Sequence, residues 1–174
     1  MSPVWTACPG CAAPLPTVHM RIDRPLNASP ACWRLYGEVT GFELQHPTLV
    51  SRFHQLAVDA YGAQHGGEPT PRIYLAYSLV GLDLALERGT HGIGVRGIHQ
   101  RMGRPDDTWP EFTPPEPAPL TVAHVADAGV RAGSVDGHAD AIADWAAAVW
   151  QSWAGQHEAI RALTDRVLAQ HHRP

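Results

Sequence analysis

Apolar residues recur at helical spacing in several segments of the chain, and start and stop signals bound those segments. Ser29-Pro30 combines an N-cap residue with a proline at the first helical position, and predicts a helix over residues 30–43. A second helix opens at His46-Pro47 and is expected to run to about His65, where Gly66-Gly67 ends it. The apolar faces consist of Cys32, Leu35, Tyr36 and Val39 in the first helix and Leu49, Phe53, Leu56 and Ala60 in the second.

Further helices are predicted downstream. The most apolar covers residues 72–88 and has the character of a buried central helix, although it contains Asp83, which we expect to pair with an arginine or a cap. Shorter helices are expected around residues 93–103 and from Thr121 to about Ala128. A long helix is predicted over roughly residues 136–170, with a core stripe of Ile142, Ala146, Val149, Trp153, Ile160 and Val167.

Two segments lack a helical period. Residues 12–28 show neither helical nor alternating spacing and are predicted to be loop. Prolines at 105, 110, 114, 115, 117 and 119 make the next segment extended, and we expect Trp109 and Phe112 to hold it against the helices as a lid or strap. The pattern predicts an all-α helical bundle with an irregular N-terminal segment and a Pro-rich strap. We expect one domain over residues 1–174, divided into segments 1–29, 30–103, 104–120 and 121–174.

Composition narrows the classes of function. A length of 174 residues is enough for one sizeable core. The formal charge of −4 and the 13 scattered Lys and Arg residues argue against nucleic-acid binding. No apolar run reaches 18 residues and no secretory signal is visible, so we expect no membrane span and a cytoplasmic protein. The 11 histidines and 6 tryptophans are unusual, and they direct attention to metal or proton chemistry.

All three cysteines lie near the N-terminus, at Cys8, Cys11 and Cys32. Two thiolates in a turn of the form Cys8-Pro9-Gly10-Cys11 can bind one tetrahedral ion, and proline and glycine suit that turn. Cys32 falls in the first turn of the predicted helix, where the helix dipole favours a thiolate. The spacing therefore predicts a zinc-knuckle-like segment and a Cys₃His zinc site. A redox pair, a structural disulfide or no role at all are the alternatives.

The fourth ligand is predicted to be His54, with His19 or His65 as alternatives. His54 and His65 are eleven residues apart, which is about 16 Å along a helix. The ligands of one zinc ion lie within about 4 Å of one another. At most one of these two histidines can therefore complete the cysteine site.

A pocket lined by aromatic and histidine side chains is a second candidate site. Trp150 and His157 lie seven residues apart on one flank of the long predicted helix, and Tyr61 shares an edge with His65 on another. An ordinary aromatic margin of the core with a hydrogen-bonded imidazole is the simpler interpretation of the tryptophan and histidine. The predicted pocket consists of Tyr61, His65, Trp150, Trp153 and His157.

Several short motifs taken together resemble a bacterial family of small cytoplasmic proteins classed as a domain of unknown function. They are Cys8-Pro9-Gly10-Cys11, His19, the segment from Ser29 to Trp33, Val58-Asp59-Ala60-Tyr61 with Gln64-His65, Leu120-Thr121-Val122, and the tail from Trp145 to Trp153 followed by His157. The chain departs from the family where Gln156 precedes His157 in place of a histidine pair. The resemblance implies a helical domain and supports grouping the three cysteines with a histidine, but it implies no reaction.

Three functions compete on this evidence. The first is a zinc-stabilised helical protein with a structural metal, which binds a small molecule or a protein partner. The second is a metalloenzyme in which the three cysteines leave a position open for water and His54, His65, Tyr61 or His157 acts as acid or base. The third is a site for iron, copper or haem built from His65 and His157. No H-E-x-x-H, G-x-S-x-G, P-loop or dinucleotide motif is present. We favour the first function.

Overall fold

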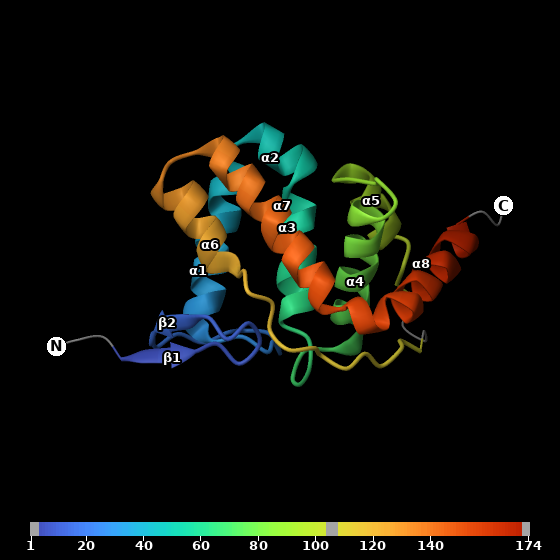
Figure 1. Ribbon diagram of the computed structural model, residues 1–174, viewed down its shortest axis with the longest axis horizontal. Helices are drawn as coiled ribbons and strands as arrows, with labels where there is room; N and C mark the ends of the chain where they lie inside the picture. Colours follow the sequence, from blue (N-terminus) through green and yellow to red (C-terminus); the bar gives the residue numbers. More distant parts are fainter. Residues whose placement is uncertain (1–3, 104–107, 172–174) are drawn as a thin grey trace.

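The computed structural model describes residues 4–103 and 108–171, and most of them are helical (Figure 1). The predicted all-α class is confirmed, with one small addition at the N-terminus. Strands β1 (Trp5–Ala7) and β2 (Pro14–Pro16) pair antiparallel, with Thr6 opposite Leu15. Residues 14–16 were predicted to be loop. They become a strand because the turn at Cys8–Cys11 reverses the chain and brings its two flanks together.

Helix α1 (Pro30–Leu44) begins as predicted. The Ser29 hydroxyl accepts a hydrogen bond from the Cys32 amide at 3.2 Å, and Pro30 occupies the first turn. The single helix predicted from Pro47 onward is two helices, α2 (Pro47–Arg52) and α3 (His54–Gln64), which meet at Phe53. Helix α3 packs against α4 (Arg72–Leu86) and α7 (Val135–Ser152), so it lies inside the bundle.

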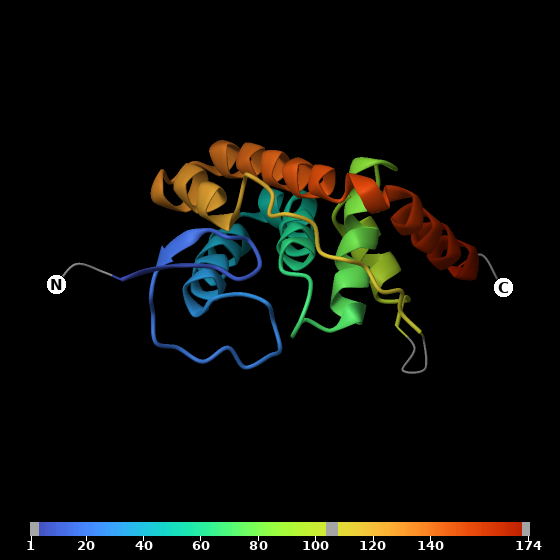
Figure 2. The same ribbon diagram turned by 60° about the horizontal axis from the view of Figure 1, so that its bottom comes forward.

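The C-terminal half differs most from the sequence prediction. Helix α5 (Ile93–His99) is shorter than expected, and α6 (Val122–Val125) continues into a π-helical turn, η1 (Ala126–Arg131). The long helix expected over residues 136–170 is broken at Trp153. Helix α7 ends there, a 3-10 turn η2 (Ala154–Gln156) follows, and α8 (His157–His171) leaves in a new direction to pack on α4 (Figures 1 and 2).

A Pro-rich strap, residues 108–120, connects α5 to α6 without helix and crosses the bundle (Figure 2). Phe112 is buried edge-on against Trp153, with ring centroids 6.4 Å apart, and the Trp109 ring lies 5.7 Å from that of Tyr77. The predicted role of Trp109 and Phe112 in holding the strap is confirmed. The first part of the predicted strap, residues 104–107 with Pro105, lies outside the described residues.

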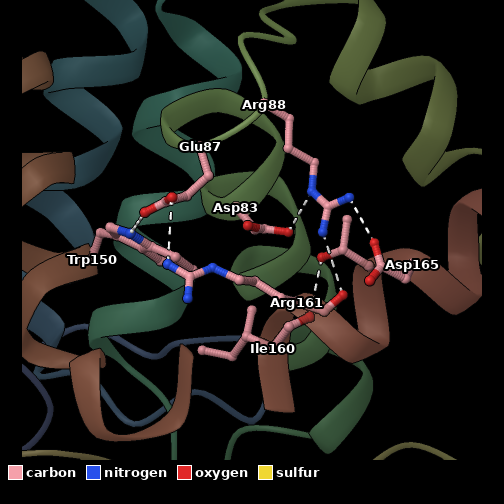
Figure 3. Close-up of polar contacts among 8 residues, drawn as sticks. Asp83, Glu87, Arg88, Trp150, Ile160, Arg161 and Asp165 are labelled. Carbon is pink, nitrogen blue, oxygen red and sulfur yellow. Dashed lines mark hydrogen bonds and ion pairs between the residues drawn. The ribbon is translucent and has the colours of Figure 1, made fainter. Parts of the chain in front are cut away.

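Buried charge joins α4 to α8 (Figure 3). Asp83 is fully buried in α4, and its Oδ2 accepts a hydrogen bond from Arg88 Nε at 2.9 Å, which confirms the arginine partner predicted for it. The same guanidinium binds Asp165 Oδ1 on α8 at 2.7 Å. One arginine therefore neutralises a core carboxylate and fastens α8 to the central helix.

Candidate metal centre

The turn between β1 and β2 directs two thiols inward. The Cys8 amide donates to Ala13 O and the Ala12 amide donates to Cys8 O, both at 2.9 Å. Ala12 adopts a positive φ of 57°, a conformation that lets the backbone fold back tightly. Both sulfurs are withdrawn from solvent as a result, since Cys8 and Cys11 are each 2% exposed.

Cys32 meets these thiols from the first turn of α1. Its Sγ lies 3.8 Å from Cys11 Sγ, which is far beyond the 2.05 Å of a disulfide bond. The Ser29 amide donates to Cys8 Sγ at 3.3 Å, so the residue that caps α1 also orients the first cysteine. The two cysteine-bearing segments are thereby brought together at the N-terminal end of this helix.

His65 supplies the fourth donor from the C-terminal end of α3. Its Nδ1 donates to Tyr61 O at 2.7 Å, which orients the ring so that Nε2 faces the sulfurs and could coordinate a metal once deprotonated. Nε2 lies 3.5 Å from Cys8 Sγ and 3.4 Å from Cys32 Sγ. The side chain is fully buried.

The four donor atoms have the spacing of a tetrahedral metal site. They all lie within 4.8 Å of one another. Around one zinc ion, bonds near 2.3 Å to sulfur and 2.0–2.1 Å to nitrogen would separate the sulfurs by about 3.8 Å and sulfur from nitrogen by about 3.5 Å. The observed 3.8, 3.5 and 3.4 Å match those edges. The residues present therefore fit a tetrahedral metal ion.

The pKa values of Cys8, Cys32 and His65 are strongly shifted by their proximity. Hydrogen bonds with Cys11 and Cys32 lower the pKa of Cys8, whereas hydrogen bonds with Cys11 and Cys8 raise the pKa of Cys32. Burial opposes protonation of His65, but its hydrogen bonds with Cys11 and Cys8 outweigh burial and raise its pKa to about 9. These shifts correspond to a Cys8 thiolate beside a protonated His65 and a protonated Cys32. A bound divalent metal would displace those protons, because metal coordination requires thiolates and a neutral imidazole.

Surrounding hydrogen bonds hold the histidine end in place. Thr70 Oγ1 donates to His65 O at 2.6 Å and accepts from the Asn27 amide at 2.9 Å. Asn27 Nδ2 donates to Gly66 O at 2.8 Å. A Cβ at Gly10 would lie 2.3 Å from Asn27 O and 2.6 Å from His65 Cδ2. A glycine is therefore required at position 10, because the Cys8–Cys11 turn (the cysteine knuckle) approaches the end of α3 closely.

The histidine predicted first as the fourth ligand lies elsewhere. His54 begins α3, while the cysteines meet the opposite end of that helix, and its Nδ1 lies 2.6 Å from Glu43 Oε2. His65, the alternative, takes the place next to the sulfurs. His19, the other alternative, is exposed in the loop after β2 and is not among the clustered donors.

The five residues of the predicted pocket are not gathered round one cavity. Tyr61 belongs to the metal centre's surroundings, where its hydroxyl donates to Cys32 Sγ at 3.7 Å. Trp150 and His157 stack on each other with centroids 3.9 Å apart, and His157 Nε2 donates to Trp150 O at 2.9 Å. Trp153 packs on the strap instead. The pairing of His65 with His157 in a separate metal site is not supported either, because each ring has a different set of partners.

A buried carboxylate between two histidines was missed from the sequence. Glu43 is fully buried, and its two oxygens bind His54 Nδ1 at 2.6 Å and His138 Nε2 at 3.2 Å. His138 is also fully buried. The available signal was the spacing of the first helix, because Glu43 continues the stripe formed by Cys32 and Val39.

Comparison with known proteins places the chain without assigning it an activity. A family model described as "Family of unknown function (DUF5946)" matches residues 6–154, from β1 to the start of η2. The resemblance to a family of unknown function is thereby confirmed. No curated protein and no solved structure matches the chain significantly. Over the described residues, none of the helices combines the length and the hydropathy that crossing a bilayer requires.

Proposed function

The chain belongs to the DUF5946 family of unknown function, and on that premise we propose that it is a zinc-stabilised helical binding protein. In this proposal Cys8, Cys11, Cys32 and His65 hold one structural Zn²⁺ ion. The metal fastens the N-terminal segment to the helices, and the helical body binds a small molecule or a protein partner. We further propose that the chain is a single cytoplasmic domain.

The observation that carries the proposal is the convergence of four buried donors with tetrahedral spacing. Three sulfurs and one imidazole form a donor set typical of structural zinc sites. The Nδ1 hydrogen bond from His65 to Tyr61 O supplies the outer support that metal-bound histidines usually have.

Two features favour a structural role over an open catalytic site. His65 occupies the fourth position, so a four-coordinate ion would have no place for water. The four side chains are also 0–2% exposed, which leaves a substrate no approach to the ion. These features argue against the metalloenzyme with an open coordination position.

The N-terminal segment needs such an anchor. Its sheet has two strands of three residues each, and an isolated hairpin of this size is marginal in water. Within residues 4–29, only three apolar side chains besides the two cysteines are buried, and two of them are alanines: Ala13, Leu15 and Ala28. Metal binding would therefore contribute much of the free energy that folds this segment.

Elemental analysis of the purified protein tests the proposal. We expect about one zinc per chain in the wild type, loss of the metal and a lower Tm in Cys8→Ser, and retention of the metal in His19→Gln as the control. His65→Gln should weaken metal binding, whereas His19→Gln should not. Because Cys8→Ser could fail to fold, cobalt substitution of the wild type gives a second measurement, with the absorption bands of a tetrahedral thiolate site expected. A metal-free wild type that stays folded with a chelator present would refute the proposal.

A further inference from the structure

An open cavity of about 430 Å³ lies beside the metal centre, bordered by α1, α3, α4, α5 and the loop that follows β2. Its volume is in the range of small-molecule sites. Aromatic rings form most of its wall: Trp33, Tyr36, Tyr61, Tyr74 and Tyr77. None of the residues that line it belongs to the four metal ligands, so this is a separate site.

The aromatic rings are arranged around a shared space. Tyr36 and Tyr61 stack with centroids 3.9 Å apart, and the Trp33 ring lies 5.7 Å from Tyr36 and 6.1 Å from Tyr61. Trp33 already holds one cation at the rim, because the Arg24 guanidinium lies 5.1 Å from its ring centroid. Ring faces carry negative potential, so a wall of this composition attracts organic cations.

A carboxyl group lies in the same wall. Asp59 is 2% exposed, and its Oδ1 accepts a hydrogen bond from Gln55 Nε2 at 3.1 Å. Its Oδ2 has no hydrogen-bond partner among the described residues. Gly81 on α4 leaves the room that this carboxyl group needs, because a Cβ there would lie 2.1 Å from Oδ2.

Within residues 4–103 and 108–171, the one cationic candidate in ion-pair range of Asp59 is His99, and Arg24 of the same cavity wall lies over the Trp33 ring instead. From α5, His99 Nδ1 lies 4.0 Å from Oδ1, and burial lowers the pKa of His99 to about 4, so that ring is neutral at pH 7. From α1 the Tyr36 phenol interacts electrostatically with Asp59, and burial raises the pKa of that phenol, so it stays neutral.

Burial raises the pKa of Asp59 well above its usual range, against the opposing effect of the Gln55 hydrogen bond, so the acid is protonated in the free protein. A cation in the cavity would favour the carboxylate form of Asp59 and would supply the partner that its Oδ2 lacks.

We propose that this cavity binds a small organic cation, a protonated or quaternary amine on an apolar body. Its positive nitrogen lies against Asp59 and its body lies between the Trp33, Tyr36 and Tyr77 rings. This assigns a ligand class to the binding role proposed above and rests on that role. It does not require the metal ion to have any part in ligand contact.

Calorimetric titration of the metal-loaded full chain tests the assignment. The probes are phenethylamine, tryptamine and benzyltrimethylammonium, with 2-phenylethanol and 3-phenylpropionate as neutral and anionic counterparts of the first. We expect at least one amine to bind, and the alcohol and the acid to bind roughly tenfold or more weakly than phenethylamine or not at all. Absence of binding by all three amines at millimolar concentration would overturn the proposal, as would equal affinity for phenethylamine and 2-phenylethanol.

Variants separate this site from the metal centre. Asp59→Asn keeps the size and shape of the protonated acid, and should lower amine affinity roughly tenfold or more while the Tm is maintained. Asp140→Asn removes an exposed carboxylate on α7 and is the matched control, with unchanged affinity expected. Unchanged affinity in Asp59→Asn would refute the role of that carboxyl group. Zinc content measured on the same samples distinguishes the two proposals. Zinc-loaded protein that binds no amine would refute only the organic-cation site. Metal-free protein that binds an amine would refute only the structural zinc site.

Discussion

Substitution of Gly10 by alanine would test how closely the cysteine knuckle must approach α3. The added methyl group would lie 2.3 Å from Asn27 O, 2.6 Å from His65 Cδ2 and 3.1 Å from His65 Cα. Two of these atoms belong to the backbone, and the third belongs to a side chain held by its hydrogen bond to Tyr61 O. None can move aside as the end of a flexible surface chain would.

The size of the effect follows from these contacts. Overpacking a tight interior by one methyl group typically costs about 1–3 kcal/mol. Because backbone atoms must shift here, we expect the upper end, about 3 kcal/mol, and a Tm lower by roughly 6–12 °C for a chain of this size. If the displaced His65 ring carries the whole strain, metal affinity falls by up to roughly 100-fold.

Thermal unfolding and competition with a chromophoric chelator measure the two effects. Gly37→Ala is the matched control, because Gly37 is exposed in α1 and a Cβ there meets nothing within 4 Å. Replacing a helical glycine by alanine should stabilise the protein by about 0.5–1 kcal/mol. If Gly10→Ala equals the wild type in both Tm and metal affinity, the close approach between the knuckle and His65 is wrong.

Three other predictions concern buried charge. Glu43→Ala should lower the free energy of unfolding, measured by urea titration, by about 3–5 kcal/mol because it leaves two histidines without their shared carboxylate. The control Glu38→Ala removes an exposed ion pair and should lower it by under about 1 kcal/mol. Equal costs would contradict the network. Arg88→Ala should cost about 3–5 kcal/mol because Asp83 loses its cation, and calorimetry showing a loss below about 1 kcal/mol would contradict this. Burial lowers the pKa of His99 to about 4, so unfolding takes up a proton and stability is lost as pH falls from about 6.5 to 4, by up to about 3 kcal/mol. His99→Gln should lose less over that range, and parallel Tm profiles would contradict the shift.

The cysteine half of the metal centre could be predicted because its determinants are local. Two cysteines in a four-residue turn define their own geometry, and Ser29-Pro30 sets the start of α1 and hence the position of Cys32. The histidine could not be predicted with the same rules. His54 is the first residue of α3 and His65 follows its last residue. Which of them faces the cysteines therefore depends only on which end of α3 meets the hairpin. That direction depends on packing between distant segments, which periodicity does not describe.

Helix breaks were the other source of error. Neither Phe53 nor Trp153 is a glycine or a proline, so no local signal marks the ends of α2 and α7. Trp153 is 1% exposed and packs edge-on against Phe112, a contact across 41 residues that the chain bends to make. Tertiary contacts of this kind override helical propensity. The stacking of Trp150 on His157 across that bend was anticipated only as an arrangement along one continuous helix.

The order of the four donors along the polypeptide has a consequence for biosynthesis. His65 follows Cys8 by 57 residues, so the knuckle leaves the ribosome well before its imidazole partner. At about 5–20 residues per second, that gap lasts roughly 3–11 seconds. During this interval the nascent thiols lack the enclosure that leaves Cys8 and Cys11 each 2% exposed in the folded protein. Closure of the four-donor cluster is therefore tied to the completion of α3, and a truncated product ending before residue 65 would carry its three cysteines without the imidazole that faces them.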